Sequence, residues 1–146
     1  MKKLTHILAI LTLALSPAFA GAGGGHGHAD AKTHGDVAIP ATLDELWAAI
    51  QKEQAALVAA LEKKDGTGGH NIAETLMAYS NALPSKVEGL DEAKMQRITG
   101  QTKNLSKVYG DIHHAAEDAA FDKSLKDAAK AAAVLKLLAE QLPLKS

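Results

Sequence analysis

The chain has 146 residues, with 16 Lys and Arg against 17 Asp and Glu, and it contains no cysteine. The lack of cysteine excludes disulfides, thiolate metal sites, covalent haem attachment and cysteine nucleophiles. The near-neutral charge balance, with Arg97 as the single arginine, argues against a protein that binds nucleic acid.

The first 20 residues have the pattern of a secretion signal. Lys2 and Lys3 precede an apolar run over residues 7–15, and the Ala-Phe-Ala sequence at 18–20 matches a cleavage site. The run is too short to span a bilayer, and no later stretch is long and apolar enough to do so. We therefore expect residues 1–20 to be removed on export, with no membrane insertion of the mature protein.

Residues 21–40 predict a flexible tail that carries histidines. Glycine fills five of the first seven positions after residue 20, and no hydrophobic periodicity follows, so we expect disorder here. His26, His28 and His34 are candidate metal ligands, because imidazole suits Cu(II), Ni(II) and Zn(II). The alternative is a solubilising linker whose histidines bind nothing.

The domain that follows, residues 41–146, begins with a predicted helix. Thr42 and Glu45 have the spacing of a capping box, in which each side chain satisfies an amide at the helix start. Apolar residues then recur at helical spacing from Leu43 to Leu61. We expect this helix to end at residues 63–65 and a glycine-rich loop to cover residues 66–69.

A second helix is predicted from a second capping pattern, formed by Asn71 and Glu74. One apolar face follows, at steps of four, three and four residues from Ile72 to Leu83. Pro84 should stop or kink the helix, because proline lacks the amide hydrogen that the helix needs.

Two more helices complete the predicted domain. Asp91 should cap the third, whose inner face would contain Met95, Ile98, Thr102, Leu105, Tyr109, Ile112 and Ala116. Asp122 should cap the fourth, whose inner face would contain Leu125, Ala128, Ala132, Leu135, Ala139 and Leu142. Four amphipathic helices with short connections predict an all-α fold, an up-down-up-down four-helix bundle.

In that topology one end of the bundle collects metal-ligating side chains. The third helix carries two i,i+4 pairs, His113 with Glu117 and His114 with Asp118, and each pair lies on one helix face within chelating reach. Each pair supplies only two ligands, so a closed site would also need His70 or a nearby aspartate. The alternative is a solvent-exposed helix end, where the helix dipole favours histidine.

Other chemistry has little support in the sequence. The possible haem ligands His113 and Met77 do not converge on one layer of the core, so we expect no haem. The serines lack a base at a recognisable motif spacing, and no phosphate-binding loop occurs, so we expect no enzyme.

Four features resemble small periplasmic helical-bundle proteins of Gram-negative bacteria that occur beside heavy-metal efflux genes. They are the signal peptide, the histidine-bearing tail, the opening segment Ile39–Trp47 and the Ala-Leu-Pro sequence at 82–84. Members of that group often have a histidine near the start of the second helix, which His70 matches. The resemblance implies a periplasmic protein in a metal-stress context.

The leading hypothesis is thus a non-enzymatic periplasmic protein that binds a divalent transition metal (Cu, Zn or Ni). It would bind the ion through the histidine tail, with His70, His113 and Glu117 on the bundle as a second candidate site, and would buffer the ion or hand it to a periplasmic efflux component. The other hypothesis is a structural or protein-interaction bundle in which metal affinity is incidental.

Overall fold

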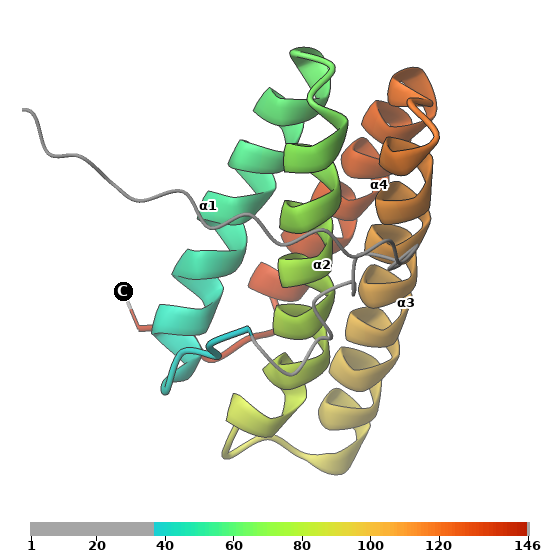
Figure 1. The fold of residues 1–146 in the computed structure, drawn as a ribbon. Coiled ribbons are helices and arrows are strands. Elements are labelled where there is room, and N and C mark those ends of the chain that lie inside the picture. Colours follow the sequence, from blue (N-terminus) through green and yellow to red (C-terminus); the bar gives the residue numbers. More distant parts are fainter. Residues whose placement is uncertain (1–36, 146) are drawn as a thin grey trace, which may run out of the picture. The chain divides into compact units, whose positions relative to one another are not determined.

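The computed structural model describes residues 37–145, and these residues form an all-helical structure (Figure 1). The helices are α1 (Leu43–Glu62), α2 (Gly66–Ala82), α3 (Glu92–Glu117) and α4 (Phe121–Ala139), with a short 3-10 helix, η2 (Leu83–Lys86), after α2. The predicted all-α class is confirmed, and residues 37–145 contain no strand. The predicted signal peptide and residues 21–36 of the tail lie outside this range. None of the described helices has the length and apolarity needed to cross a membrane.

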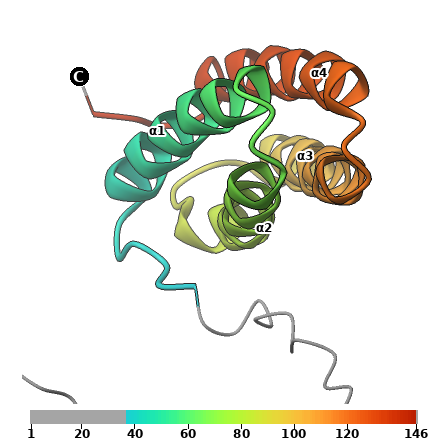
Figure 2. The same ribbon diagram turned by 45° about the horizontal axis from the view of Figure 1, so that its top comes forward.

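The four helices pack around one hydrophobic core. Viewed towards the helix ends, α2 lies between α1 and α3, while α4 lies beside α1 and α3 (Figure 2). Each helix contributes side chains that are fully buried. The largest are Leu46, Ile50, Leu57, Leu61, Leu76, Leu83, Ile98, Leu105, Tyr109, Ile112 and Leu138.

A chain of buried hydrogen bonds joins three of the helices inside this core. The Tyr109 hydroxyl on α3 donates to Gln54 Oε1 on α1 at 2.7 Å, and Gln54 Nε2 donates to the Ala128 carbonyl on α4 at 3.0 Å. Burial raises the pKa of Tyr109, which keeps its hydroxyl protonated and therefore a donor.

Two of the predicted helix starts are confirmed and two are wrong. Thr42 forms the capping box of α1 with Glu45, and Asp91 caps α3. The second helix begins at Gly66 and is capped by Asp65, so residues 66–69 are helical and the predicted cap at Asn71 is wrong. The fourth helix begins at Phe121 and has no side-chain cap, so the prediction for Asp122 is also wrong.

The second and fourth helices begin earlier than predicted because of how the preceding helices end. In α1 the Asp65 amide donates to the Ala60 carbonyl, and Lys64 adopts a left-handed conformation with φ of 57°. In α3 the Ala120 amide donates to the Ala115 carbonyl, and Ala119 has φ of 55°. Both are Schellman turns formed without glycine. The chain therefore reverses within a few residues, and the glycines at 66–69 are free to enter α2.

The inner face of α4 also differs from the prediction. Ala132 and Ala139 are exposed, and the buried positions include Ala131 and Leu138. Alanine occupies much of this helix, so two apolar stripes one residue apart fit the sequence almost equally well. Packing selects the stripe that buries Leu138 together with Leu135.

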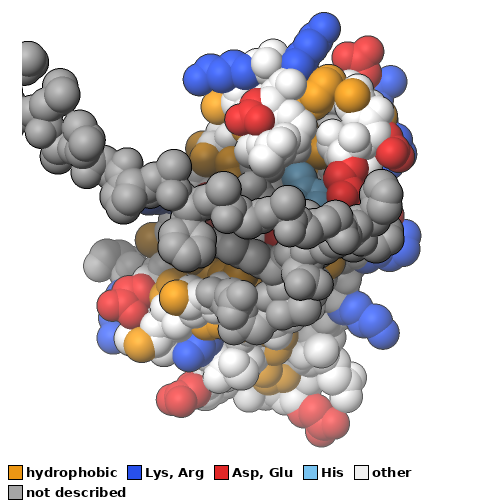
Figure 3. Space-filling view, viewed as in Figure 1, with side chains coloured by type: hydrophobic (Ala, Val, Ile, Leu, Met, Phe, Trp, Pro, Cys, Tyr) orange, Lys and Arg blue, Asp and Glu red, His pale blue; other side chains and the backbone are white. Residues whose placement is uncertain are grey.

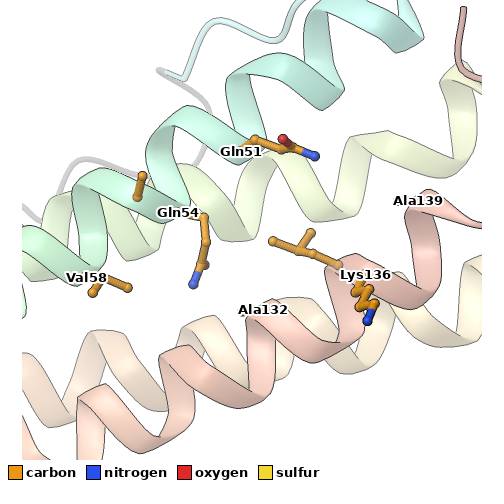
Figure 4. A pocket seen from close by; sticks show the side chains of 8 residues that line it. Gln51, Gln54, Val58, Ala132, Lys136 and Ala139 are labelled. Carbon is orange, nitrogen blue, oxygen red and sulfur yellow. The ribbon is translucent and has the colours of Figure 1, made fainter. Parts of the chain in front are cut away.

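An open groove separates α1 from α4, as the side chains in Figure 4 show. Its volume is about 680 Å³, and small or apolar side chains dominate its lining. The α1–α4 groove is lined by Gln51, Gln54, Ala55, Val58, Ala132, Leu135, Lys136 and Ala139.

Candidate metal centre

Glycines bring the first turn of α2 close to the last turns of α3. A Cβ atom on Gly66 would lie 2.9 Å from the Ala116 carbonyl oxygen, closer than real Cβ contacts come. A Cβ on Gly69 would lie 3.0 Å from a Leu61 methyl and 3.5 Å from the Ala116 methyl. Only a glycine fits at 66 without a backbone shift, and this approach sets His70 against α3.

The helix cap uses a third glycine in the same turn. Asp65 Oδ1 accepts a hydrogen bond from the Gly68 amide at 2.9 Å, which satisfies one of the free amides at the helix start. A Cβ on Gly68 would overlap the Asp65 carboxylate. The glycine-rich segment thus allows both the cap and the close contact.

The site consists of His70 on α2 with His113 and Glu117 on α3. The two imidazole rings lie with centroids 3.8 Å apart and planes tilted by 35°. His70 Nδ1 lies 3.7 Å from Glu117 Oε1. One ligand atom from each residue lies within 4.8 Å of the others, so the three could hold a metal ion. We call this group the three-residue site.

His70 carries a buried nitrogen that lacks a hydrogen bond. Its Nδ1 has no hydrogen-bond partner, because 3.7 Å to Glu117 is too long for one. The His70 side chain is 18% exposed, whereas that of Glu117 is 57% exposed. A buried polar atom without a partner is costly in free energy, and a metal ion would satisfy it.

The electrostatics of His113 favour its neutral form. Partial burial lowers the pKa of His113, and the neighbouring His70 and His114 lower it further, against the opposing carboxylates of Glu117 and Glu74. A neutral imidazole is the form that binds metal ions. Near neutral pH the ring therefore has a lone pair available.

The other predicted ligands lie outside the three-residue site. His114 is 76% exposed, with Nδ1 3.9 Å from Glu117 Oε2 and its ring edge-on to that of His113 at 5.0 Å. Asp118 is the exposed C-cap of α3, where its amide donates to the His114 and Ala116 carbonyls. The tail residues His26, His28 and His34 fall outside the described range of 37–145.

Glu74 belongs to the surroundings of the site, although the sequence analysis gave it a capping role. Its negative charge acts on His113 and opposes the lowering of the pKa of that ring by burial and by the neighbouring histidines. The signal was present in the sequence, since Glu74 follows His70 by four residues and so shares its helix face. Figure 3 shows histidine surface recessed beside acidic side chains.

Comparison with known proteins gives no match to a family model, to a curated protein or to a solved structure.

Proposed function

We propose that this protein is a non-enzymatic metal-binding protein whose ion sits between α2 and α3. The observation that carries the proposal is the convergence of three ligand atoms from His70, His113 and Glu117 within 4.8 Å. The unpartnered Nδ1 of His70 adds support, because it is a buried donor or acceptor that only an absent partner would satisfy.

The donor set indicates the class of ion. Two imidazole nitrogens and one carboxylate oxygen suit Zn(II), Cu(II) and Ni(II), whereas the absence of thiolates disfavours tight binding of soft ions. A set of three protein ligands leaves at least one coordination position for water or for a further protein side chain. A site without thiolate ligands is suited to ions that must be released again, as in buffering or delivery.

The wider setting follows from the sequence and forms part of the same proposal. An exported, periplasmic protein with an up-down-up-down bundle would carry the three-residue site on its folded domain and His26, His28 and His34 on its tail. The tail would bind ions weakly and raise their local concentration. A periplasmic efflux component would receive them.

The test separates the folded domain from the tail. We define the tail-substituted protein as the full chain with His26→Ala, His28→Ala and His34→Ala. Its Zn(II) affinity, measured by competition with a chromophoric chelator, should fall at least about tenfold on His70→Ala, which removes a ligand. His114→Ala is the matched control and should leave the affinity nearly unchanged. Equal affinities in the two variants would overturn the assignment.

A further inference from the structure

Two copies of the same short pattern face each other across the α2–α3 interface. His70 is followed four residues later by Glu74 on α2, and His113 is followed four residues later by Glu117 on α3. Residues four apart lie on one helix face, about one turn from each other. Each helix therefore presents one imidazole and one carboxylate along the same stripe.

The contacts between the helices give their relative direction. Near the start of α2, Gly66 lies against Ala116, towards the end of α3. Farther along α2, the Met77 methyl and sulfur lie 3.6 and 3.8 Å from the position that a Cβ on Gly110 would take. Moving forward along α2 thus means moving backward along α3, so the two helices are antiparallel here.

Antiparallel packing pairs each histidine with the carboxylate of the other helix. His70 lies beside Glu117, at 3.7 Å. One turn forward on α2 is Glu74, and one turn backward on α3 from Glu117 is His113. The register thus brings Glu74 towards His113, in agreement with the influence of the Glu74 charge on that ring.

We propose that Glu74 is the fourth protein ligand of the metal ion, so that two antiparallel His-x3-Glu pairs form a His2Glu2 site. This inference rests on the proposed function and extends it. Two carboxylates balance the charge of a divalent ion, whereas Glu117 alone would leave a net positive charge in a partly buried place. Four oxygen and nitrogen donors also favour Zn(II) in tetrahedral coordination.

Beyond Glu74 the α2–α3 interface continues with an apolar contact. Met77 lies about one turn beyond Glu74, and its methyl and sulfur would be in ordinary contact with a Cβ on Gly110, at 3.6 and 3.8 Å. The outer side includes Glu117, which is more than half exposed. Ions would therefore enter from the end of the bundle that carries Glu117.

The experiment compares Glu74→Gln with Glu88→Gln in the tail-substituted protein. Both variants remove one negative charge without changing side-chain size, and Glu88 lies exposed in the segment before α3. We expect Glu74→Gln to weaken Zn(II) binding at least about tenfold and to change the visible spectrum of bound Co(II). Glu88→Gln should do neither.

The possible outcomes separate this inference from the proposed function. Unchanged Zn(II) affinity in Glu74→Gln would overturn the fourth ligand and leave the three-residue site intact. Weaker binding with an unchanged Co(II) spectrum would make Glu74 a positioning residue, which also overturns the ligand assignment. No Zn(II) binding by the tail-substituted protein itself would overturn both proposals. Thermal unfolding without metal shows whether each variant folds.

Discussion

The interface between α2 and α3 and the interface between α1 and α4 use small residues to opposite effect. At the first, Gly66 leaves a place that the Ala116 carbonyl occupies, Gly69 lies against the Ala116 methyl, and the backbones come close together. At the second, Ala55, Ala132 and Ala139 line the open α1–α4 groove. A small residue tightens an interface only where a neighbour enters the space it leaves.

The polar groups of the two interfaces differ in the same way. Gln54 on α1 donates to the Ala128 carbonyl on α4 and accepts from Tyr109 on α3, so its polar atoms are satisfied within the protein. At the α2–α3 interface, the buried Nδ1 of His70 has no such partner. The satisfied hydrogen bonds of Gln54 stabilise the fold, whereas the unsatisfied Nδ1 of His70 is the better candidate for binding an external ion.

The largest expected effect comes from closing the space at Gly66. Gly66→Ala places a methyl 2.9 Å from a backbone oxygen, so α2 must shift, at a cost of about 1–3 kcal/mol in the free energy of unfolding. The shift should also move His70 and weaken Zn(II) binding. Urea unfolding and chelator competition measure the two effects.

Gly100→Ala is the matched control for that substitution. Gly100 lies within α3 with nothing within 4 Å of its added Cβ, so helix propensity alone should stabilise the protein by about 0.5–1 kcal/mol. Opposite signs of the change in the free energy of unfolding for Gly66→Ala and Gly100→Ala would support a close contact at Gly66. The same sign would show that the close contact at Gly66 does not limit the packing.

A smaller loss of stability is expected from breaking the buried hydrogen bonds of Gln54. Tyr109→Phe leaves Gln54 Oε1 buried without its donor, which should cost about 1–2 kcal/mol in urea unfolding. Tyr79→Phe is the control, because Tyr79 is only partly buried, and its effect should stay within about 0.5 kcal/mol. Equal losses would mean that the Tyr109 hydroxyl contributes nothing specific.

The smallest expected effect is a change with pH in the stability of the metal-free protein, caused by His113 at the α2–α3 interface. In the folded protein the pKa of His113 is lowered from its ordinary value of 6.5, which we take for the unfolded chain. Between the folded pKa and the unfolded pKa, the unfolded chain therefore binds more protons than the folded one. Stability of the metal-free protein should therefore fall as the pH drops below 6.5 towards the folded pKa, and it should be unaffected by this group at higher pH. Urea unfolding across this range gives the slope.

His113→Gln removes this titration and should flatten that part of the pH profile. The same acidification should weaken Zn(II) binding, because protons compete for the imidazole nitrogens. An identical pH profile in the variant would contradict the role given to His113.

The sequence predicts the helical fold well because its signals are local. Apolar spacing identifies four helices, and Thr42 and Asp91 begin two of them as expected. The start of α2 was missed because a glycine-rich segment has the composition of a loop, although packing against Ala116 holds it in the helix. The register of α4 was missed because its many alanines leave the buried stripe ambiguous.

The site was predicted in part, for a similar reason. The sequence places His70, His113, His114, Glu117 and Asp118 near one end of the bundle, and core positions at Ile112 and Ala116 put His113 and Glu117 on the flank, with His114 and Asp118 farther out. Whether His70 lies against this flank depends on how closely α2 and α3 pack, a property that no local pattern determines. His113 and Glu117 face His70, while His114 is largely exposed.

The most direct test of a metal ion between α2 and α3 is NMR of the histidine rings during Zn(II) titration of the tail-substituted protein. We predict that the His70 and His113 signals change together and stop changing at one equivalent of Zn(II), while the His114 ring shifts little. If the His70 and His113 signals stay constant, or if His114 alone responds, the α2–α3 interface does not hold the ion.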